Sequence, residues 1–114
     1  MEIQTRSIVG VFLSHGEVEQ ARLKLRGTSM LLLRTEVVNS TNVGKHVLGT
    51  LMPQLEADYL LRQLEKGRSL LIVQVPAEDG MAAFKFMTEV AGSRETTALW
   101  GRSERVVRMV TSPV

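Results

Sequence analysis

The chain has 114 residues, 44% of them hydrophobic, which fits one domain with a modest core and excludes a disordered chain. Its 14 basic and 12 acidic side chains are mostly interspersed and leave a formal charge of +2, so we expect no nucleic-acid-binding face. The absence of cysteine excludes disulfide bonds, thiolate nucleophiles and thiolate-bound metals. No apolar stretch approaches ~20 residues, so we expect no signal sequence, no membrane partner and a cytoplasmic location.

The first elements are predicted to be a strand and an amphipathic helix. Residues 7–13 are apolar on both faces, which is typical of a strand in the middle of a sheet. Ser14 and Glu17 fit a capping box, in which the serine hydroxyl accepts from the glutamate amide while the carboxylate reaches back. The helix that follows has an apolar stripe of Val18, Ala21 and Leu25. Gly27 is predicted to end this helix in a left-handed conformation.

The middle of the chain is predicted to hold a strand, a long loop and a helix. Residues 29–38 are expected to form the strand, with 30–33 as its buried part. Residues 39–50 are polar and contain two glycines, so they are predicted to be a long loop. A helix is predicted over 51–67, because Pro53 suits a first helical turn. Its apolar face would consist of Leu55, Ala57, Leu60, Leu61 and Leu64.

The last third is predicted to add a strand, a helix and one or two further strands. Residues 70–75 form an apolar strand run, and Asp79 is a candidate cap for the next helix. The stripe of that helix would consist of Ala82, Ala83, Phe86, Met87 and Val90, with Gly92 as its exit. Residues 96–100 favour a fourth strand. The C-terminal extension, 101–114, is expected to hold either a short fifth strand over 105–110 or an unstructured, solvated tail.

Two stretches of the chain resemble each other and predict the architecture. Residues 6–13 and 68–75 both begin with an Arg-Ser pair and continue as an apolar run, and a helix-period segment follows each. We therefore expect a single domain over 1–114, of the α+β class: a ferredoxin-like βαββαβ sandwich with an extra helix inserted between the two halves. Two helices would cover one face of the sheet. The other face would need the inserted helix or a second subunit, and self-association through the sheet is the leading expectation.

Two segments of the sequence also resemble the small bacterial general-stress-protein domain family, whose members are similar to heat-induced stress proteins. The opening Ile8-Val9-Gly10-Val11-Phe12 with its acidic helix is similar to the family's first strand and helix. The family's second motif is a proline-containing acidic segment that ends in tyrosine and is followed by a glycine and an apolar strand. A similar order occurs here in Leu51-Met52-Pro53-Gln54-Leu55-Glu56-Ala57-Asp58-Tyr59, with Gly67 and an apolar strand after it. The resemblance does not extend to the tail beyond Gly101. It implies a ferredoxin-like fold and a non-enzymatic stress or regulatory role in a bacterium.

Three residues are candidates for ligand binding. Lys45 and His46 lie in the predicted loop, where a lysine–histidine pair could hold an anion, although a flexible solvated loop is the favoured explanation. Tyr59 on the predicted helix could offer its hydroxyl at a cleft, or pack its ring against the sheet. Trp100 at the end of a strand is either a subunit-contact anchor or a rim residue that covers the core.

No catalytic or metal signature accompanies these residues. His15 and His46 are the neutral-pH acid–base groups, and His15 falls in a capping turn where exposure is expected. No spacing of carboxylates and histidines argues for a metal. We therefore predict no catalytic residue, no metal and no cofactor.

Three functions follow as hypotheses. The first is a non-enzymatic regulatory or stress-related domain that forms a dimer or larger homo-oligomer, or binds a protein partner. The alternative is a sensor of a small anion or nucleotide, similar in plan to nitrogen-regulatory trimers, with residues 39–50 as its ligand loop between subunits. The third is an enzyme of the dimeric-barrel kind, which would enclose His15 or His46 in an apolar cavity.

Overall fold

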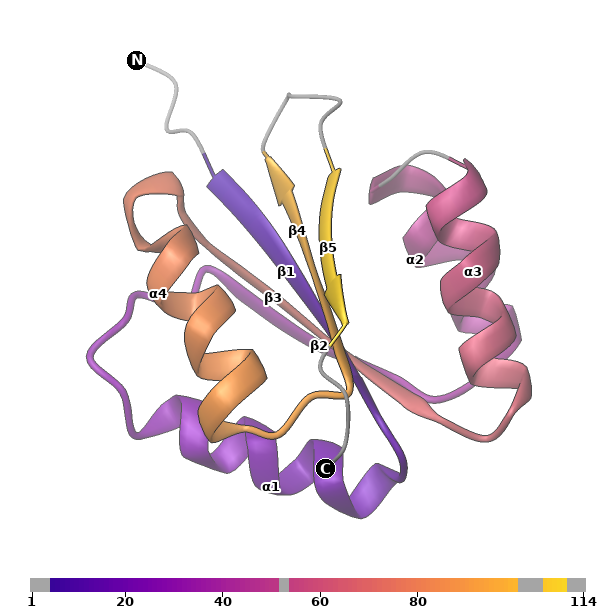
Figure 1. The fold of residues 1–114 in the computed structure, drawn as a ribbon, viewed down its shortest axis with the longest axis horizontal. Helices are drawn as coiled ribbons and strands as arrows, with labels where there is room; N and C mark the ends of the chain where they lie inside the picture. Colours follow the sequence, from indigo (N-terminus) through magenta and orange to yellow (C-terminus); the bar gives the residue numbers. More distant parts are fainter. Residues whose placement is uncertain (1–4, 52–53, 101–105, 111–114) are drawn as a thin grey trace.

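The computed structural model describes residues 5–51, 54–100 and 106–110 (Figure 1). The sheet and the four α-helices form three layers, in which α1 and α4 lie on one face of the sheet and α2 and α3 on the other (Figure 1). The elements in chain order are β1 (Thr5–Phe12), α1 (His15–Arg26), β2 (Arg34–Val38), α2 (Thr41–Leu51), α3 (Gln54–Glu65), β3 (Ser69–Pro76), the 3₁₀ turn η1 (Ala77–Asp79), α4 (Gly80–Lys85), the π-helical turn η2 (Phe86–Val90), β4 (Glu95–Trp100) and β5 (Val106–Val110).

The five strands form one sheet with the order β2-β3-β1-β4-β5, and every neighbouring pair is antiparallel. Val9 of β1 lies opposite Ile72 of β3 on one side and opposite Thr97 of β4 on the other. The expected α+β class is therefore confirmed, as is a fourth strand near the predicted position. Of the two alternatives for the C-terminal extension, residues 106–110 form the strand. The two apolar runs become the strands β1 and β3, which are neighbours inside the sheet.

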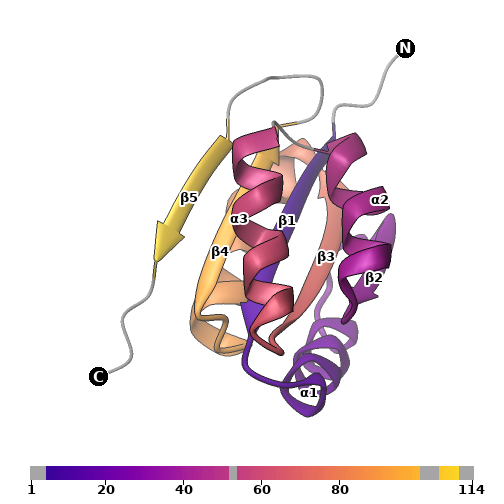
Figure 2. The same cartoon turned by 90° about the vertical axis from the view of Figure 1, so that its right-hand side faces the viewer.

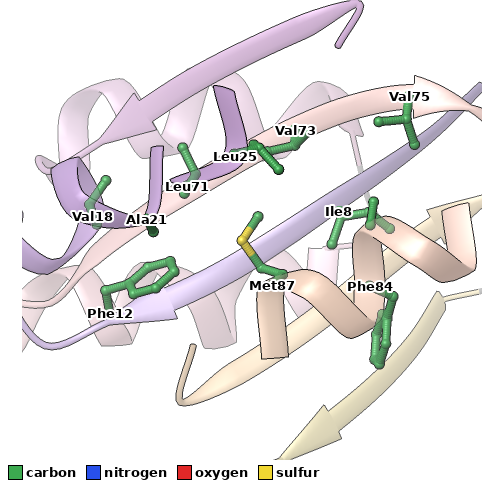
Figure 3. Packing of buried hydrophobic residues seen from close by; sticks show 11 residues of the cluster. Ile8, Phe12, Val18, Ala21, Leu25, Leu71, Val73, Val75, Phe84 and Met87 are labelled. Atoms are coloured by element: carbon green, nitrogen blue, oxygen red, sulfur yellow. The ribbon is translucent and has the colours of Figure 1, made fainter. Parts of the chain in front are cut away.

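The core between the sheet and helices α1 and α4 is apolar and closely packed (Figure 3). Ile8 and Phe12 project from β1, and the predicted stripe of α1 packs against them. Burying each such side chain stabilises the fold by about 1.5–3 kcal/mol. This cluster consists of Ile8, Phe12, Val18, Ala21, Leu25, Leu71, Val73, Val75, Ala83, Phe84 and Met87.

A second apolar core lies on the opposite face of the sheet, beneath helices α2 and α3 (Figure 2). It consists of Val9, Val11, Val38, Val47, Leu48, Ala57, Leu60, Leu64, Leu70 and Ile72. The inserted segment of the same chain thus covers the face for which a neighbouring subunit was considered. The apolar character of β1 and β3 on both faces requires no self-association through the sheet face.

Residues 39–50 were expected to be a loop, and this expectation is wrong, because Thr41–Leu51 form helix α2. The Ser40 hydroxyl accepts from the Val43 N–H at 3.4 Å, as a helix cap does. Gly44 argued for a loop because glycine weakens a helix by about 1 kcal/mol relative to alanine. Here it permits close packing on α3: a Cβ at this position would lie 2.5 Å from Leu64 Cδ1. The insertion is therefore a pair of helices, and the helix predicted over 51–67 begins at Gln54.

The second strand is shorter than predicted, because β2 begins at Arg34 and residues 29–33 lie outside it. The Leu33 N–H donates to the Gln74 carbonyl at 2.8 Å, while the ladder pairs Arg34 with the same residue. Two consecutive residues thus face Gln74, the arrangement of a β-bulge, and the regular ladder starts after it. Of the expected buried part, Leu31 is 60% exposed and Leu33 is 45% exposed.

The third helix of the prediction is divided into α4 and the wider turn η2. The Ala91 N–H donates to the Phe86 carbonyl five residues earlier at 2.9 Å, which defines a π turn. The buried stripe differs from the predicted one, because Phe84 is buried while Ala82 and Val90 are exposed. The Asp79 side chain makes no capping hydrogen bond to the helix it precedes.

The glycine exits are correct at two of three positions. Gly67 and Gly92 have φ values of +86° and +77°, the left-handed conformation expected after a helix. Gly27 follows the last residue of α1 as predicted, but its φ of −79° is right-handed, so the left-handed conformation predicted for it is wrong. The Ser14 cap of α1 is confirmed, since its hydroxyl accepts from the Glu17 N–H at 3.3 Å.

The two similar stretches form adjacent strands, but their residues do not correspond one to one. The sequence match aligns Ile8 with Leu70, yet Ile8 packs beneath α1 and α4 whereas Leu70 packs beneath α2 and α3. Side chains alternate between the faces of a strand, so the match is out of phase by one residue. Both strands are apolar on both faces, and their sequences therefore carry no signal of which residue faces which helix pair.

Candidate functional site

The three predicted ligand-binding residues do not form one site. Lys45 and His46 are exposed on α2, while Tyr59 on α3 is half-buried and contacts the second core. Figure 2 shows α3 in front of β1 and β4, and α2 towards β3 and β2. Lys45 and His46 therefore lie on a different helix from Tyr59.

Tyr59 reaches the sheet through a hydrogen bond that the sequence did not suggest. Its hydroxyl donates to Oε1 of Glu95, the first residue of β4. Glu95 is only 8% exposed, and its Oε2 atom is buried without a hydrogen-bond partner among the described residues. A buried carboxylate is costly unless it is hydrogen-bonded. The Tyr59 hydroxyl is therefore important for holding this side chain between α3 and the sheet.

The backbone before β4 fixes the position of Glu95. The Ser93 hydroxyl accepts from the Val11 N–H at 3.0 Å and donates to the Glu95 carbonyl. The Arg94 N–H donates to the Val11 carbonyl at 2.8 Å, and Glu95 then pairs with Val11 in the ladder. Ser93 itself is 2% exposed. These bonds join β4 to the central strand, so the Tyr59–Glu95 pair fastens α3 to a rigid part of the sheet.

The Tyr59–Glu95 hydrogen bond joins α3 to the first residue of β4. One carboxylate and one phenol are too few ligands to hold a metal ion. No group of three or more metal-ligating side chains occurs within the part of the chain that the structure describes. Glu95 immediately precedes a predicted strand and belongs to no motif, so its burial could not be predicted from the sequence.

Both histidines are exposed, which removes the geometry that the enzyme hypothesis needs. The His15 side chain is 56% exposed, with its Nε2 atom 3.6 Å from Glu19 Oε1. Its Nδ1 atom lies 3.4 Å from Asn39 Nδ2. His46 lies on the exposed side of α2. The sensor hypothesis loses its ligand loop in the same way, because the residues assigned to that loop form a helix.

Trp100 is the last residue of β4 and pairs with Arg6 of β1 in the ladder. Its side chain falls outside the described residues, so its role as an interface anchor stays a prediction.

Arg6 is 4% exposed, and burial lowers the pKa of its guanidinium from the ordinary value. An arginine remains charged at physiological pH even so.

At one end of the sheet, the edge strand β2 combines an unpaired backbone side with exposed apolar side chains beside it. In the described sheet β2 pairs with β3 alone, so one side of its backbone faces no strand. The exposed Leu31 and Leu33 lie directly before it. Within the strand, Arg34 Nη2 lies 2.7 Å from Glu36 Oε2, and these side chains are 54% and 27% exposed. We call residues 31–38 the β2 edge.

No family model, no curated protein and no solved structure matches this chain. The resemblance to the general-stress-protein domain family therefore stays a prediction. Among the helices in the described ranges, none has the length and apolar character needed to cross a bilayer.

Proposed function

We propose that this chain is a small non-enzymatic regulatory or stress-related domain that acts by self-association, forming a dimer or a larger homo-oligomer. The observation that carries the proposal is the β2 edge, where an unpaired side of a strand follows two exposed leucines. Unpaired strand edges are templates for pairing with another chain. Exposed apolar side chains beside such an edge add surface that association can bury.

A ferredoxin-like arrangement is part of the proposal. The order β2-β3-β1-β4 is the order that two interleaved strand–helix–strand units would produce. Helices α1 and α4 lie on the same face of the sheet, as the crossover helices of such units do (Figure 1). In this view α2 and α3 are the insertion between the halves, and β5 is an addition to the edge.

The chemistry of the described side chains supports a non-catalytic role. The histidines are exposed, and the buried carboxylate of Glu95 accepts from Tyr59 in a contact that fastens a helix. The stress-related part of the proposal, and a bacterial cytoplasmic setting, rest on the sequence resemblance and on composition. A protein partner at the β2 edge is the other way in which such a surface could be used.

The proposal is tested by measuring the mass of the purified chain with light scattering after size exclusion, over a range of micromolar concentrations. We expect a dimer or larger species that dissociates on dilution. Replacing the exposed leucines together (Leu31→Lys with Leu33→Lys) should raise the dissociation constant at least about tenfold, since exposed apolar area is removed. Met81→Lys is the matched control, because Met81 is 57% exposed on α4, and it should not change the mass. A monomer at every concentration would overturn the proposal.

A further inference from the structure

We infer that the β2 strand of one chain pairs antiparallel with the β2 strand of a second copy, around a two-fold axis at Thr35. Each Arg34 would then face the partner's Glu36. This inference rests on the proposed self-association and specifies its surface and its register. A two-fold interface uses the same patch on both subunits, so the patch has to be complementary to itself.

The charges of β2 favour one register among those centred on Arg34, Thr35 or Glu36. In a two-fold antiparallel pair, residues at equal distances on either side of the axis lie opposite each other. An axis at Thr35 places Arg34 opposite the partner's Glu36, and this occurs twice. An axis at Arg34 would oppose two guanidinium groups, and an axis at Glu36 would oppose two carboxylates. Because like charges directly opposite each other destabilise strand pairs, Thr35 is the favoured centre.

The two faces of the strand are consistent with this register. Glu36 lies opposite Ile72 and Arg34 opposite Gln74, so both charged residues belong to the face covered by α2 and α3. Both are accessible enough to meet a second chain: the side chains are 54% exposed for Arg34 and 27% exposed for Glu36. The leucines of the β2 edge precede the paired stretch, where a second copy could cover their exposed side chains.

Two variants, each with one charge reversed, distinguish contacts between two chains from the ion pair that Arg34 and Glu36 make within one chain. Arg34→Glu gives a strand with two acidic positions, and Glu36→Arg gives one with two basic positions. Each variant alone should dissociate at least about tenfold more readily, because both cross-strand contacts become repulsive. Mixed in equal amounts, the two variants should form a heterodimer with both contacts restored. The ion pair within one chain cannot form again in either variant, since each variant has two like charges at positions 34 and 36.

Native mass spectrometry distinguishes the two variants by mass and measures homodimer and heterodimer in one sample. The matched control is Glu19→Arg with Arg22→Glu, a pair on α1 whose charged atoms are 2.6 Å apart and whose reversals change net charge by the same amounts. The control variants should associate as the unchanged chain does, separately and when mixed. The preference for the heterodimer should weaken in high salt, which screens exposed charges.

The outcomes separate the inference from the proposed function. Loss of the homodimers with recovery in the mixture supports the register. An oligomer that neither reversal affects would overturn the register and leave self-association standing. A monomeric unchanged chain would overturn both.

Discussion

At the scale of single residues, the Tyr59–Glu95 contact has the clearest energetic consequence. The carboxylate is 8% exposed, and the tyrosine hydroxyl donates to one of its oxygens. Removing one partner of a buried hydrogen bond leaves the other unsatisfied, at a cost of about 1–3 kcal/mol. The hydrogen bond itself therefore adds little net stability. Its loss is costly because the Glu95 carboxylate would stay buried without its donor.

Tyr59→Phe should therefore lower the free energy of unfolding by about 1–3 kcal/mol, because the ring is kept while the Glu95 carboxylate loses its donor. Urea denaturation followed by circular dichroism measures the change. Asp58→Asn, at the exposed neighbouring position on α3, serves as the control and should stay within about 0.5 kcal/mol of the unchanged chain. A Tyr59→Phe variant as stable as the control would show that the hydroxyl does not stabilise the buried carboxylate.

At the scale of elements, the helix pair α2–α3 is what closes the second core. Val47 and Leu48 project from α2 into a cluster that includes both central strands, whereas Val43 on the same helix is 47% exposed. If the segment that contains Val47 and Leu48 were a polar loop, the part of the cluster that they cover would be open to water. The close approach at Gly44 lets the two helices lie together on the sheet.

Leu48→Ala should destabilise the protein by about 2–5 kcal/mol, since the side chain is fully buried and its removal leaves a cavity. Val43→Ala, five residues earlier on the exposed side of the same helix, should change stability by less than about 0.5 kcal/mol. Thermal or urea unfolding of the two variants side by side makes the comparison. Two equally small effects would indicate that this segment does not pack on the sheet.

At the scale of the whole molecule, the sheet is protected unequally. The central strands β1 and β3 are covered on both faces and paired on both sides, and their apolar residues are 0–2% exposed. The β2 strand is an edge, and two of its five residues, Arg34 and Thr35, are exposed. Backbone amides in such regions exchange with solvent through local openings that cost less than global unfolding.

Native-state hydrogen exchange should therefore be slowest in β1 and β3 and faster in β2. If β2 pairs with a second copy, its protection should also rise with protein concentration while that of β1 does not, because association covers only the edge. Exchange followed by mass spectrometry at two concentrations, above and below the dissociation constant, measures this. Protection of β2 that is independent of concentration in an oligomeric protein would place the interface elsewhere.

Much of the architecture was predictable because local patterns carried it. The double-sided apolar runs marked the two central strands, the Ser14 cap marked the start of α1, and the stripe of Val18, Ala21 and Leu25 marked its buried face. Each of these signals is a property of neighbouring residues along the chain, and a sequence displays such properties directly.

The tertiary structure decided the features that depend on partners distant in sequence. From the sequence, Gly44 indicates a loop. In the structure it lies in helix α2, where the absence of a side chain lets Leu64 approach closely. The phase of the apolar strands could not be read, because side chains on both of their faces are apolar. The burial of Glu95 depends on Tyr59, thirty-six residues away in the chain, and on the fold that brings α3 over β4. Propensity and periodicity describe an element by itself, whereas these features arise where two elements meet.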